Sequence, residues 1–324
     1  MEPHNPRRFR EFIGQKSVVQ RLEILLNAWR MYKEPLPHIL FEGPFGIGKK
    51  TLASVLPNEL GTSIQMANSA SLNCPRDLLP FLTNAEEASI LFIDEIHRMP
   101  RVVEELIYSA TEDFRADIVL GEGINARSVN LKLKRFTLIG ATTCSGLLSG
   151  RMRDRFKMHE HLEFYNEDDL AQIVTINAKK LQTKIDQDAA RELASRSRGN
   201  PRIANARLWW ARNFAASEAD GCITLDIARR ALVMAEVDVS GLDQQDRRYL
   251  ETLVGICSGG PTGVEALAAT MNLSADILSD EIEPYLLREQ FIVRSPRGRV
   301  ATGKAYEHLG RQKPGDAPEG SLFE

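Results

Sequence analysis

A glycine-rich segment near the N-terminus constrains this chain more than any other feature. Residues Gly43 to Lys49 satisfy G-x-x-x-x-G-K, the first part of the phosphate-binding P-loop pattern. In such a loop the glycines let backbone N–H groups surround a triphosphate, and Lys49 reaches its β- and γ-oxygens. The pattern then requires a hydroxyl that ligates Mg²⁺, but this chain has Lys50, whose ammonium cannot ligate a cation. The segment therefore predicts nucleotide binding and leaves hydrolysis open.

The composition is that of an ordinary soluble globular protein. The 324 residues suffice for two or three domains, 43% of them are hydrophobic, and no apolar run has membrane-spanning length. With a net charge of −3, binding to nucleic acid would depend on a local basic patch. The four scattered cysteines favour free thiols in a reducing compartment, and no signal-peptide pattern is present. We therefore expect a cytoplasmic protein without a membrane segment.

Short apolar runs around the loop predict a parallel sheet. The run 38–42 enters the loop as a buried strand, and residues 49–60 leave it as a helix that Gly61 ends. Pro57 should kink or stop this helix near Leu56, because proline removes a backbone hydrogen bond and clashes with the preceding turn. The next predicted elements are a strand at 64–67 and a helix around 77–82.

An apolar run that ends in two acids forms the second motif. Residues 89–93 read as a buried parallel strand, with Asp94 and Glu95 at its carboxyl end, where open α/β sheets place their ligands. In a Walker B strand the aspartate supports Mg²⁺ and the following glutamate polarises the attacking water. A core strand that ends in solvated acids would look the same in isolation. Its place after the P-loop makes the ATPase interpretation far more specific.

A third apolar run, 136–143, ends in hydroxyls and predicts a strand whose polar end senses the γ-phosphate. Arginines follow it at Arg151, Arg153 and Arg155. Arginines on a loop in this position suit an arginine finger, which stabilises charge on a neighbour's transferring phosphoryl group. A finger supplied to a neighbour implies a ring of subunits. Without the upstream motifs, this cluster would be read as a solvated basic turn.

Several further segments match one family in content and order. They are Phe12-Ile13-Gly14-Gln15, the near P-loop, Leu91–Arg98, Ile118–Ser128, Phe136–Thr143, Arg153–Phe156, Leu162–Tyr165, Pro201–Asn205 and Pro296–Arg299. Together they closely resemble RuvB, the AAA+ ATPase family that drives branch migration of Holliday junctions, from Pro6 to about Gly310. The resemblance implies an α/β P-loop ATPase core with a parallel sheet flanked by helices, then a helical lid and a winged-helix domain. The implied divisions are 1–162 for the ATPase domain, 163–237 for the lid, 238–310 for the winged helix and 311–324 for a disordered tail.

The resemblance also implies roles for single residues. Lys49 would hold the β- and γ-phosphates of ATP, Asp94 would support Mg²⁺ indirectly, and Glu95 would activate the attacking water. Arg155 matches the arginine finger, and Arg202 matches the sensor-2 arginine that contacts nucleotide from the same subunit. The remaining implied nucleotide contacts are Gly43, Gly46, Gly48, Lys50, Thr51, Glu112, Asp113, Phe114, Thr143 at the sensor-1 position, and Tyr165.

The C-terminal part carries the DNA-binding signal. Residues 288–299 hold four arginines against one acid, and 294–299 read as the turn of a winged-helix wing. Arginines there suit phosphate contacts, which give affinity without sequence readout. The predicted DNA-binding residues are Arg294, Arg297 and Arg299.

A predicted β-hairpin at 118–131 is the expected contact with a partner protein. Val129 and Leu131 alternate with polar neighbours, and Gly121 and Gly123 supply the turn. By resemblance the hairpin docks on a RuvA-like protein, although a hairpin packed on its own domain is the alternative. The other implied partners are the arms of a Holliday junction, a RuvC-like resolvase, and further subunits in a homo-hexamer or a mixed ring.

The nucleotide site departs from the family pattern at several positions. Lys50 replaces the Mg²⁺-ligating hydroxyl, Phe45 replaces a residue that is usually proline, and Asn5 stands where the family has an arginine. One hypothesis is an active ATP-driven motor that works as a hexameric ring. Another is a subunit that binds nucleotide and DNA with weak or no hydrolysis and donates Arg155 to an active neighbour. A third, an adaptor ATPase acting on protein, fits poorly with the arginine-bearing wing.

Overall fold

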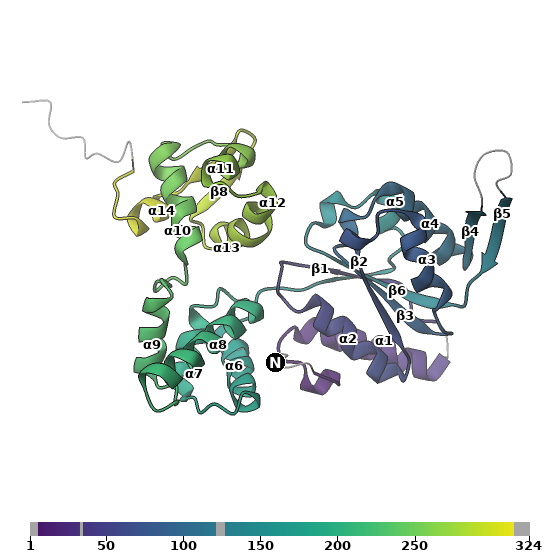
Figure 1. The fold of residues 1–324 in the computed structure, drawn as a ribbon, viewed down its shortest axis with the longest axis horizontal. Helices are drawn as coiled ribbons and strands as arrows, with labels where there is room; N and C mark the ends of the chain where they lie inside the picture. Colours follow the sequence, from purple (N-terminus) through teal and green to yellow (C-terminus); the bar gives the residue numbers. More distant parts are fainter. Residues whose placement is uncertain (1–5, 33–34, 121–126, 314–324) are drawn as a thin grey trace, which may run out of the picture. The chain divides into compact units, whose positions relative to one another are not determined.

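The computed structural model describes residues 6–32, 35–120 and 127–313 (Figure 1). One compact unit comprises the described residues up to Lys180 together with Asn200–Arg202, and a second comprises Leu181–Gly199 and the described residues from Ile203 onward. Among these residues, no helix is both long and apolar enough to cross a membrane. Asn5, the predicted hairpin turn and most of the predicted tail lie outside the described residues.

A parallel sheet forms the centre of the first unit, as predicted. Its order is β2-β3-β6-β1-β7, and all neighbouring strands run parallel. The carboxyl ends of these strands meet at one edge of the sheet, and the end of β6 lies between those of β1 and β3. The strands are β1 (Ile39–Glu42), β2 (Ile64–Asn68), β3 (Ser89–Asp94), β6 (Phe136–Thr142) and β7 (Met158–His161).

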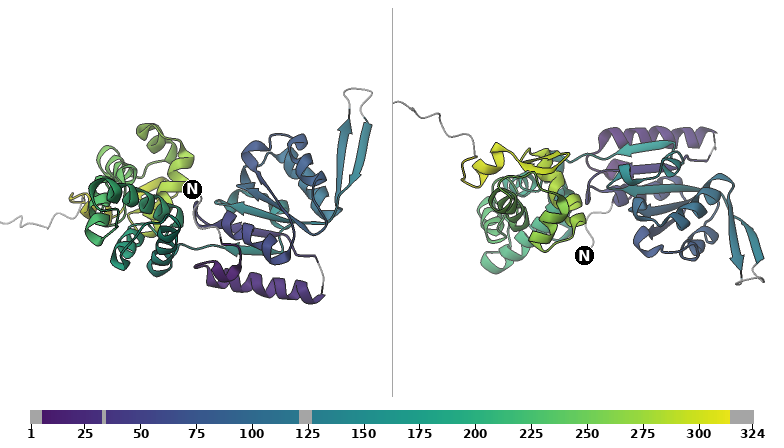
Figure 2. Two further views of the ribbon diagram at one scale, coloured as in Figure 1. Left: turned by 60° about the horizontal axis from the view of Figure 1, so that its bottom comes forward. Right: turned by 90° about the horizontal axis from the view of Figure 1, so that it is seen from above.

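Helices cover both faces of this sheet (Figures 1 and 2), with α1 and α2 on one face and α3 and α4 on the other. Along β3, Leu91 and Ile93 pack in the cluster that includes α3 and α4, and Ile90 and Phe92 point to the opposite face. All four are buried, which explains why the strand is a continuous apolar run. The helices are α1 (Lys16–Tyr32), α2 (Lys49–Leu60), α3 (Pro75–Thr83), α4 (Arg101–Glu112), α5 (Gly150–Arg153) and α6 (Glu167–Lys180).

The helix that leaves the glycine-rich loop runs through its internal proline. α2 continues to Leu60, so the predicted stop near Leu56 is wrong. Pro57 lies in the last turn, where its carbonyl accepts hydrogen bonds from the N–H groups of Gly61 and Thr62. These C-terminal bonds satisfy the end of the helix, and Gly61 ends it as predicted, in the left-handed conformation.

A two-stranded hairpin projects from the first unit beside α4 (Figures 1 and 2). β4 (Arg115–Leu120) pairs antiparallel with β5 (Arg127–Lys132), and Ile118 lies opposite Val129. At the base, Ala116 is buried and Leu131 packs against the core, whereas Val129 is exposed. The hairpin thus begins three residues earlier than predicted, and Ala116 and Leu131 attach its base to the core.

The second unit combines helices α7 to α9 with a winged-helix part. Helices α7 and α9 pack together, and the winged-helix part has a core around Tyr249, Leu267 and Leu286. α10 opens this part of the fold, and a loop at 259–263 precedes α11. The elements are α7 (Gln187–Ser195), α8 (Pro201–Glu218), α9 (Leu225–Met234), α10 (Gln244–Glu251), α11 (Val264–Met271), α12 (Ala275–Ile277), α13 (Glu283–Arg288), β8 (Ile292–Ser295), β9 (Gly298–Ala301) and α14 (Gly303–His308).

Candidate functional site

The glycine-rich loop between β1 and α2 has a backbone that only glycine adopts easily. Gly43, Gly46 and Gly48 have φ angles of 147°, 76° and 104°. A Cβ atom on Gly43 would lie 2.5 Å from the carbonyl oxygen of Leu162, and one on Gly46 would lie 2.8 Å from Oδ1 of Asn200. The loop therefore has the glycine-dependent backbone conformation, closely packed against its neighbours, that is typical of a phosphate-binding loop.

Two lysines open the helix that follows this loop. Lys49 is only 6% exposed, and its Nζ donates to the carbonyl oxygens of Gly43 at 2.6 Å and Pro44 at 3.0 Å. The loop therefore fixes the ammonium of Lys49 within its own curve. Lys50 is exposed at the next position, and Thr51 is partly buried about 100° further round the helix. The position of the usual hydroxyl ligand is thus occupied by an ammonium.

The two acids end β3 at the same edge of the sheet. Oδ1 of Asp94 accepts a hydrogen bond from the N–H of Glu95 at 3.1 Å, and Glu95 has a left-handed backbone with φ 47°. Oε2 of Glu95 accepts from the Thr143 N–H at 3.3 Å and from Thr143 Oγ1 at 3.1 Å. It also lies 3.3 Å from Nδ1 of His97, which contacts Oγ1 of Thr142 at 2.9 Å. Glu95 is therefore held in place by the end of β6 and by His97.

Arg155 and Glu112, which were assigned to different contacts, are paired with each other. Nη2 of Arg155 lies 2.9 Å from Oε2 of Glu112, and its guanidinium lies 6.0 Å from the ring centre of Tyr108. Within the described part of the chain, the buried Nε of Arg155 has no hydrogen-bond partner. The ion pair therefore places Arg155, the predicted arginine finger, beside Glu112, a predicted nucleotide contact, on the surface of one subunit.

The neighbouring residues Asp113 and Phe114 differ in environment. Asp113 is exposed at the end of α4, whereas the ring of Phe114 packs edge-on against Phe136 with centroids 6.0 Å apart. The guanidinium of Arg135 covers the Phe114 ring at 5.7 Å. A contact between nucleotide and Phe114 would therefore use its backbone or the ring edge.

Tyr165 packs against the glycine-rich loop. A Cβ on Gly48 would lie 3.5 Å from its Oη, and a Cβ on Gly14 would lie 2.5 Å from its ring. Burial raises the pKa of the Tyr165 phenol well above its ordinary value, so the group stays neutral and can donate a hydrogen bond. The backbone segment around Gly14 and Gln15 therefore meets the loop at this tyrosine.

Arg202 lies beside the same loop at the start of α8. Its guanidinium carbon is 4.4 Å from the ring centre of Phe45. Nδ2 of Asn200 donates to the Phe45 carbonyl at 2.8 Å, and Oδ1 of Asn200 accepts from the Arg202 N–H at 2.9 Å. The phenylalanine that departs from the family pattern thus provides a flat π-face for the predicted sensor-2 arginine.

A buried carboxylate organises the wing in the second unit. Glu283 is 0% exposed and accepts hydrogen bonds from Arg294, Arg299 and the Tyr249 hydroxyl at 2.7–3.1 Å. The Arg299 side chain is 17% exposed and that of Arg294 is 49% exposed. Arg297 is exposed in the turn, and within the described residues it forms no ion pair. The three predicted DNA contacts therefore comprise one free arginine and two that are tied to Glu283.

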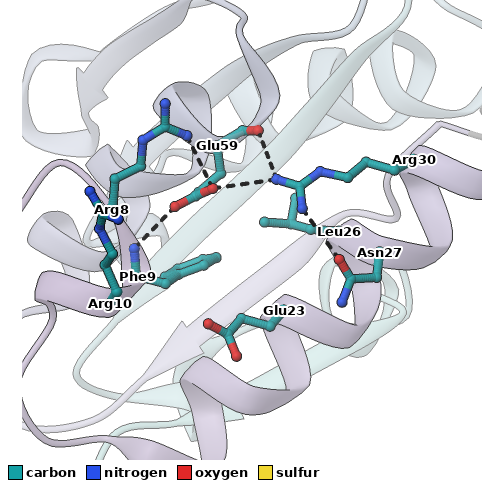
Figure 3. Close-up of a pocket in the computed structure, with 8 residues that line it drawn as sticks. All are labelled: Arg8, Phe9, Arg10, Glu23, Leu26, Asn27, Arg30 and Glu59. Carbon is teal, nitrogen blue, oxygen red and sulfur yellow. Dashed lines mark hydrogen bonds and ion pairs between the residues drawn. The ribbon is translucent and has the colours of Figure 1, made fainter.

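A separate pocket of about 590 Å³ in the first unit contains none of the predicted site residues (Figure 3). Glu59 of α2 accepts a hydrogen bond from the Phe9 N–H and forms ion pairs with Arg8 at 3.3 Å and Arg30 at 3.4 Å. These contacts attach the N-terminal segment to α1 and α2. The lining residues are Arg8, Phe9, Arg10, Glu23, Leu26, Asn27, Arg30 and Glu59.

Some residues at these sites escaped the sequence analysis. His97 lies two residues after Glu95, and this closeness to the two acids was the signal available in the sequence. Asn200 lies two residues before Arg202, and no local sequence pattern indicated its hydrogen bond to Phe45. Glu283 lies more than ten residues before the wing, so its pairing with the wing arginines is visible only in three dimensions.

Three domain models cover nearly the whole chain. Residues 4–162 match the P-loop domain of the Holliday junction DNA helicase RuvB, and residues 165–238 match the RuvB AAA lid domain. Residues 239–310 match the RuvB C-terminal winged-helix domain.

Individual RuvB proteins are similar over the same length. The chain is 53% identical to the Holliday junction branch migration complex subunit RuvB of Rhodopirellula baltica over 95% of this chain and 84% of that protein. It is 48% identical to the Kosmotoga olearia protein of the same name, over 94% of this chain and 89% of that one. The structure of the Thermotoga maritima RuvB branch migration motor superposes with a TM-score of 0.87 at 41% identity, covering 96% of this chain and 99% of that one.

Proposed function

The chain belongs to the RuvB family, and we infer that it is the ATP-dependent DNA motor subunit of a Holliday junction branch-migration complex. It binds ATP and couples its hydrolysis to DNA translocation, in partnership with a RuvA protein. The observation that carries this conclusion is the combination of an ATPase site at one sheet edge with a winged-helix part in a single chain. Recombination and DNA repair are the processes that such a motor serves, and the cytoplasm is the proposed location.

For the nucleotide, we propose that Gly43, Gly46 and Gly48 open the loop backbone toward the phosphates. Lys49 would exchange its two carbonyl contacts for phosphate oxygens, since its Nζ already lies within the loop. Tyr165 and Arg202 line the same loop and would contact nucleotide from the same subunit. Lys50, Thr51 and the run Glu112-Asp113-Phe114 complete the proposed contacts.

Glu95 is the proposed base that orients and deprotonates the attacking water. Its carboxylate accepts two hydrogen bonds from Thr143, so the proposed γ-phosphate sensor and the proposed base are directly linked. A sensor that moves with the γ-phosphate would thereby move Glu95 as well. Arg155 would stabilise the transferring group in a neighbouring subunit, with Glu112 holding the guanidinium until the neighbour's phosphate replaces it.

The donor set at the sheet edge fits a magnesium ion held mainly by water and phosphate oxygens. Asp94 supplies a carboxylate at the end of β3, and no group of three or more His, Cys, Asp or Glu in the described chain could hold a metal alone. When bound with ATP, Mg²⁺ neutralises charge on the β- and γ-phosphates. Asp94 would support it indirectly, and the exposed Lys50 would contribute positive charge nearby.

Because Arg155 would act in the active site of a neighbouring subunit, we propose that the subunits form a ring. This ring is a homo-hexamer or a mixed ring. The hairpin of β4 and β5 is the proposed RuvA contact, because it projects from its unit and exposes Val129 (Figure 1). A RuvC-like resolvase is a further proposed partner of the complex. Arg294, Arg297 and Arg299 are the proposed contacts with the phosphates of the junction arms.

The test of the proposed function uses the purified chain with Mg²⁺ and ATP. ATP turnover is measured with and without four-way DNA, and movement of the junction is measured with a RuvA protein present. Turnover together with ATP-dependent junction movement supports the motor. Binding of ATP and DNA with neither turnover nor movement would instead establish the non-catalytic subunit.

Lys50→Thr is expected to raise Mg²⁺-dependent ATP turnover by about tenfold or more, because metal stabilisation of phosphate charge is worth several kcal/mol. The restored hydroxyl can ligate the ion, and a repelling ammonium is removed. Turnover is measured across a Mg²⁺ titration, with Lys16→Thr at the exposed start of α1 as the matched control. Equal turnover in the variant and the original chain would mean that Lys50 is a neutral replacement.

Arg297→Ala is expected to weaken DNA binding and to reduce the slope of log K against log salt by about 1, as loss of one phosphate contact requires. Arg297 is exposed in the wing turn and unpaired among the described residues, so its loss should leave the fold intact. Fluorescence anisotropy with labelled junction DNA at several salt concentrations measures this slope. Arg230→Ala, which removes an arginine paired with Asp226 on α9, serves as the control. An unchanged slope in Arg297→Ala would exclude this phosphate contact.

A further inference from the structure

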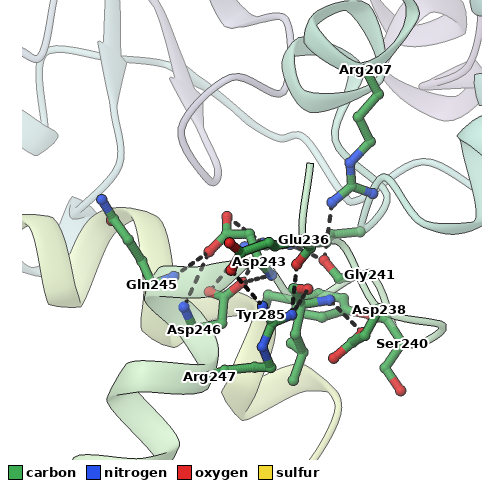
Figure 4. A network of polar contacts seen from close by, with 12 residues as sticks. Arg207, Glu236, Asp238, Ser240, Gly241, Asp243, Gln245, Asp246, Arg247 and Tyr285 are labelled. Atoms are coloured by element: carbon green, nitrogen blue, oxygen red, sulfur yellow. Dashed lines mark hydrogen bonds and ion pairs between the residues drawn. The ribbon is translucent and has the colours of Figure 1, made fainter. Parts of the chain in front are cut away.

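A buried network of charged side chains joins the helical and winged-helix parts of the second unit (Figure 4). Arg198 follows α7 and is 5% exposed, and Arg207 lies buried on α8. Both face the start of α10, where Asp243 caps the helix and Asp246 is 0% exposed. Because two arginines meet two aspartates, the formal charges of the network balance.

The guanidinium of Arg198 bonds through all three of its nitrogens. Nε donates to the carbonyl oxygen of Gly241 at 2.8 Å, Nη1 to Oδ1 of Asp246 at 3.0 Å, and Nη2 to Oδ2 of Asp243 at 2.7 Å. A further ion pair joins Nη2 to Asp246, and the guanidinium lies 5.4 Å from the ring centre of Tyr285. The side chain of Arg198, in the helical part, thus contacts Gly241 between α9 and α10, the start of α10, and Tyr285 on α13.

The backbone between the helical and winged-helix parts is also closely packed. Gly241 has φ 76°, and a Cβ there would lie 2.6 Å from the carbonyl oxygen of Arg196. Nη2 of Arg207 donates to the same Gly241 carbonyl at 3.0 Å, and Nη1 of Arg288 on α13 donates to the carbonyl of Arg198 at 3.2 Å. Parts of a chain that share a small polar interface normally move independently. Here the bonds run in both directions across the joint and oppose such movement.

Burial shifts the titration of this network. Burial raises the pKa of Asp246 to about 7 against the opposing charge of Arg198. Burial also lowers the pKa of Arg207 to about 9, and the like charge of Arg198 adds to this shift. Both groups are therefore well removed from water, so loss of Arg198 would leave a buried carboxylate poorly compensated.

The network also lies close in sequence to two residues that contact the phosphate-binding loop. Arg198, in the second unit, is followed within four residues by Asn200 and Arg202, which belong to the first unit and contact Phe45. Arg198 and Gly199 both have left-handed backbones, with φ of 57° and 70°. A displacement of Arg202 relative to the loop would thus act on Arg198 through very few bonds.

We propose that Arg198 is a positioning residue for DNA translocation, which makes the helical and winged-helix parts one rigid body that carries nucleotide-driven movement to the DNA. The proposal rests on the motor function given above. A motor that transmits work through a domain needs a joint that does not bend, and the hydrogen bonds and ion pairs across this joint meet that need. Arg198 has no part in the chemistry of hydrolysis under this proposal.

The test compares ATP turnover with junction movement in the full chain. Arg198→Met keeps an unbranched stem but removes the charge and every hydrogen bond. Base pairs moved per ATP hydrolysed should fall about tenfold, within the range of ordinary coupling free energies, while DNA-stimulated turnover stays within about twofold of the original chain. Arg198→Lys should not rescue movement, because a lysine lacks the planar fork. Arg229→Ala is the matched control, since Arg229 pairs with Glu192 at the surface of the helical part.

A second variant covers the case in which Arg198→Met does not fold. Asp243→Ser keeps a hydroxyl that can cap α10 but removes the carboxylate that Arg198 holds, and this side chain is 45% exposed. It should lower the number of base pairs moved per ATP severalfold. The proposal is overturned if a folded variant moves as many base pairs per ATP as the original chain. It is equally overturned if turnover and movement fall in proportion. An original chain that moves no junction would reject the motor function itself and this coupling role with it.

Discussion

Glu95→Gln is expected to lower kcat for ATP by about 10²–10⁴-fold, the range that a positioned general base contributes. The amide keeps the shape of the carboxylate and can still contact Thr143, but it cannot take a proton from water. Binding of ATP should remain, because Lys49 and the loop are untouched. Steady-state turnover with junction DNA and titration with a fluorescent ATP analogue measure the two effects separately.

Glu105→Gln is the matched control for this substitution. Glu105 is an exposed carboxylate on α4 in the same unit, so its loss should leave both turnover and binding unchanged. If Glu95→Gln turned over ATP at the original rate, another group would have to activate the water. Glu95 would then serve only to hold Thr143 and His97 in place.

The sheet could be predicted from sequence because its strands are buried on both faces. Runs such as 89–93 and 136–142 are continuous apolar segments, and each ends in polar residues at the ligand edge. The order of the strands was not readable from periodicity, although the polar residues that end these runs indicated which strand ends lie at the ligand edge. The predicted stop of the helix near Leu56 was wrong. α2 continues past Pro57, and the Pro57 carbonyl accepts hydrogen bonds from Gly61 and Thr62 at the helix end.

Contacts between distant segments account for most of what the sequence could not predict. Phe45 was visible as a departure from the family pattern, but its stacking with Arg202 joins residues more than 150 positions apart. Arg294 and Arg299 were predicted as phosphate contacts from their charge and their place in a turn. Charge alone could not indicate that a buried carboxylate already binds them, because Glu283 lies on a preceding helix.

Glu283→Ala is expected to destabilise the winged-helix part by about 3–5 kcal/mol, since removing one partner of a buried ion pair leaves charge uncompensated. Glu283 is 0% exposed and binds Arg299, Arg294 and Tyr249. Arg294 is half exposed and regains water, so most of the cost should come from Arg299 and Tyr249. Amide hydrogen exchange of residues 244–301 measures the loss as faster exchange in the core. Glu289→Ala, which removes a surface carboxylate paired with Arg288 and Lys304, should cost less than about 1 kcal/mol.

The pH dependence of this stability distinguishes a charged Glu283 from a neutral one. Burial would raise the pKa of Glu283, but the hydrogen bonds and charges of Arg299 and Arg294 outweigh it and hold the pKa below its ordinary value. The stabilisation is therefore fully present above the unfolded-state pKa and is lost as pH falls through the folded-state pKa. Protection of the wing against exchange should decline in acid for the original chain and decline less for Glu283→Gln, which has no carboxyl to protonate. If the original chain and Glu283→Gln lost protection equally in acid, Glu283 would not be the group that titrates. A separate comparison is between Arg297→Ala and Glu283→Ala. If these two variants lost the same protection, the wing would depend on its exposed turn instead of the buried carboxylate.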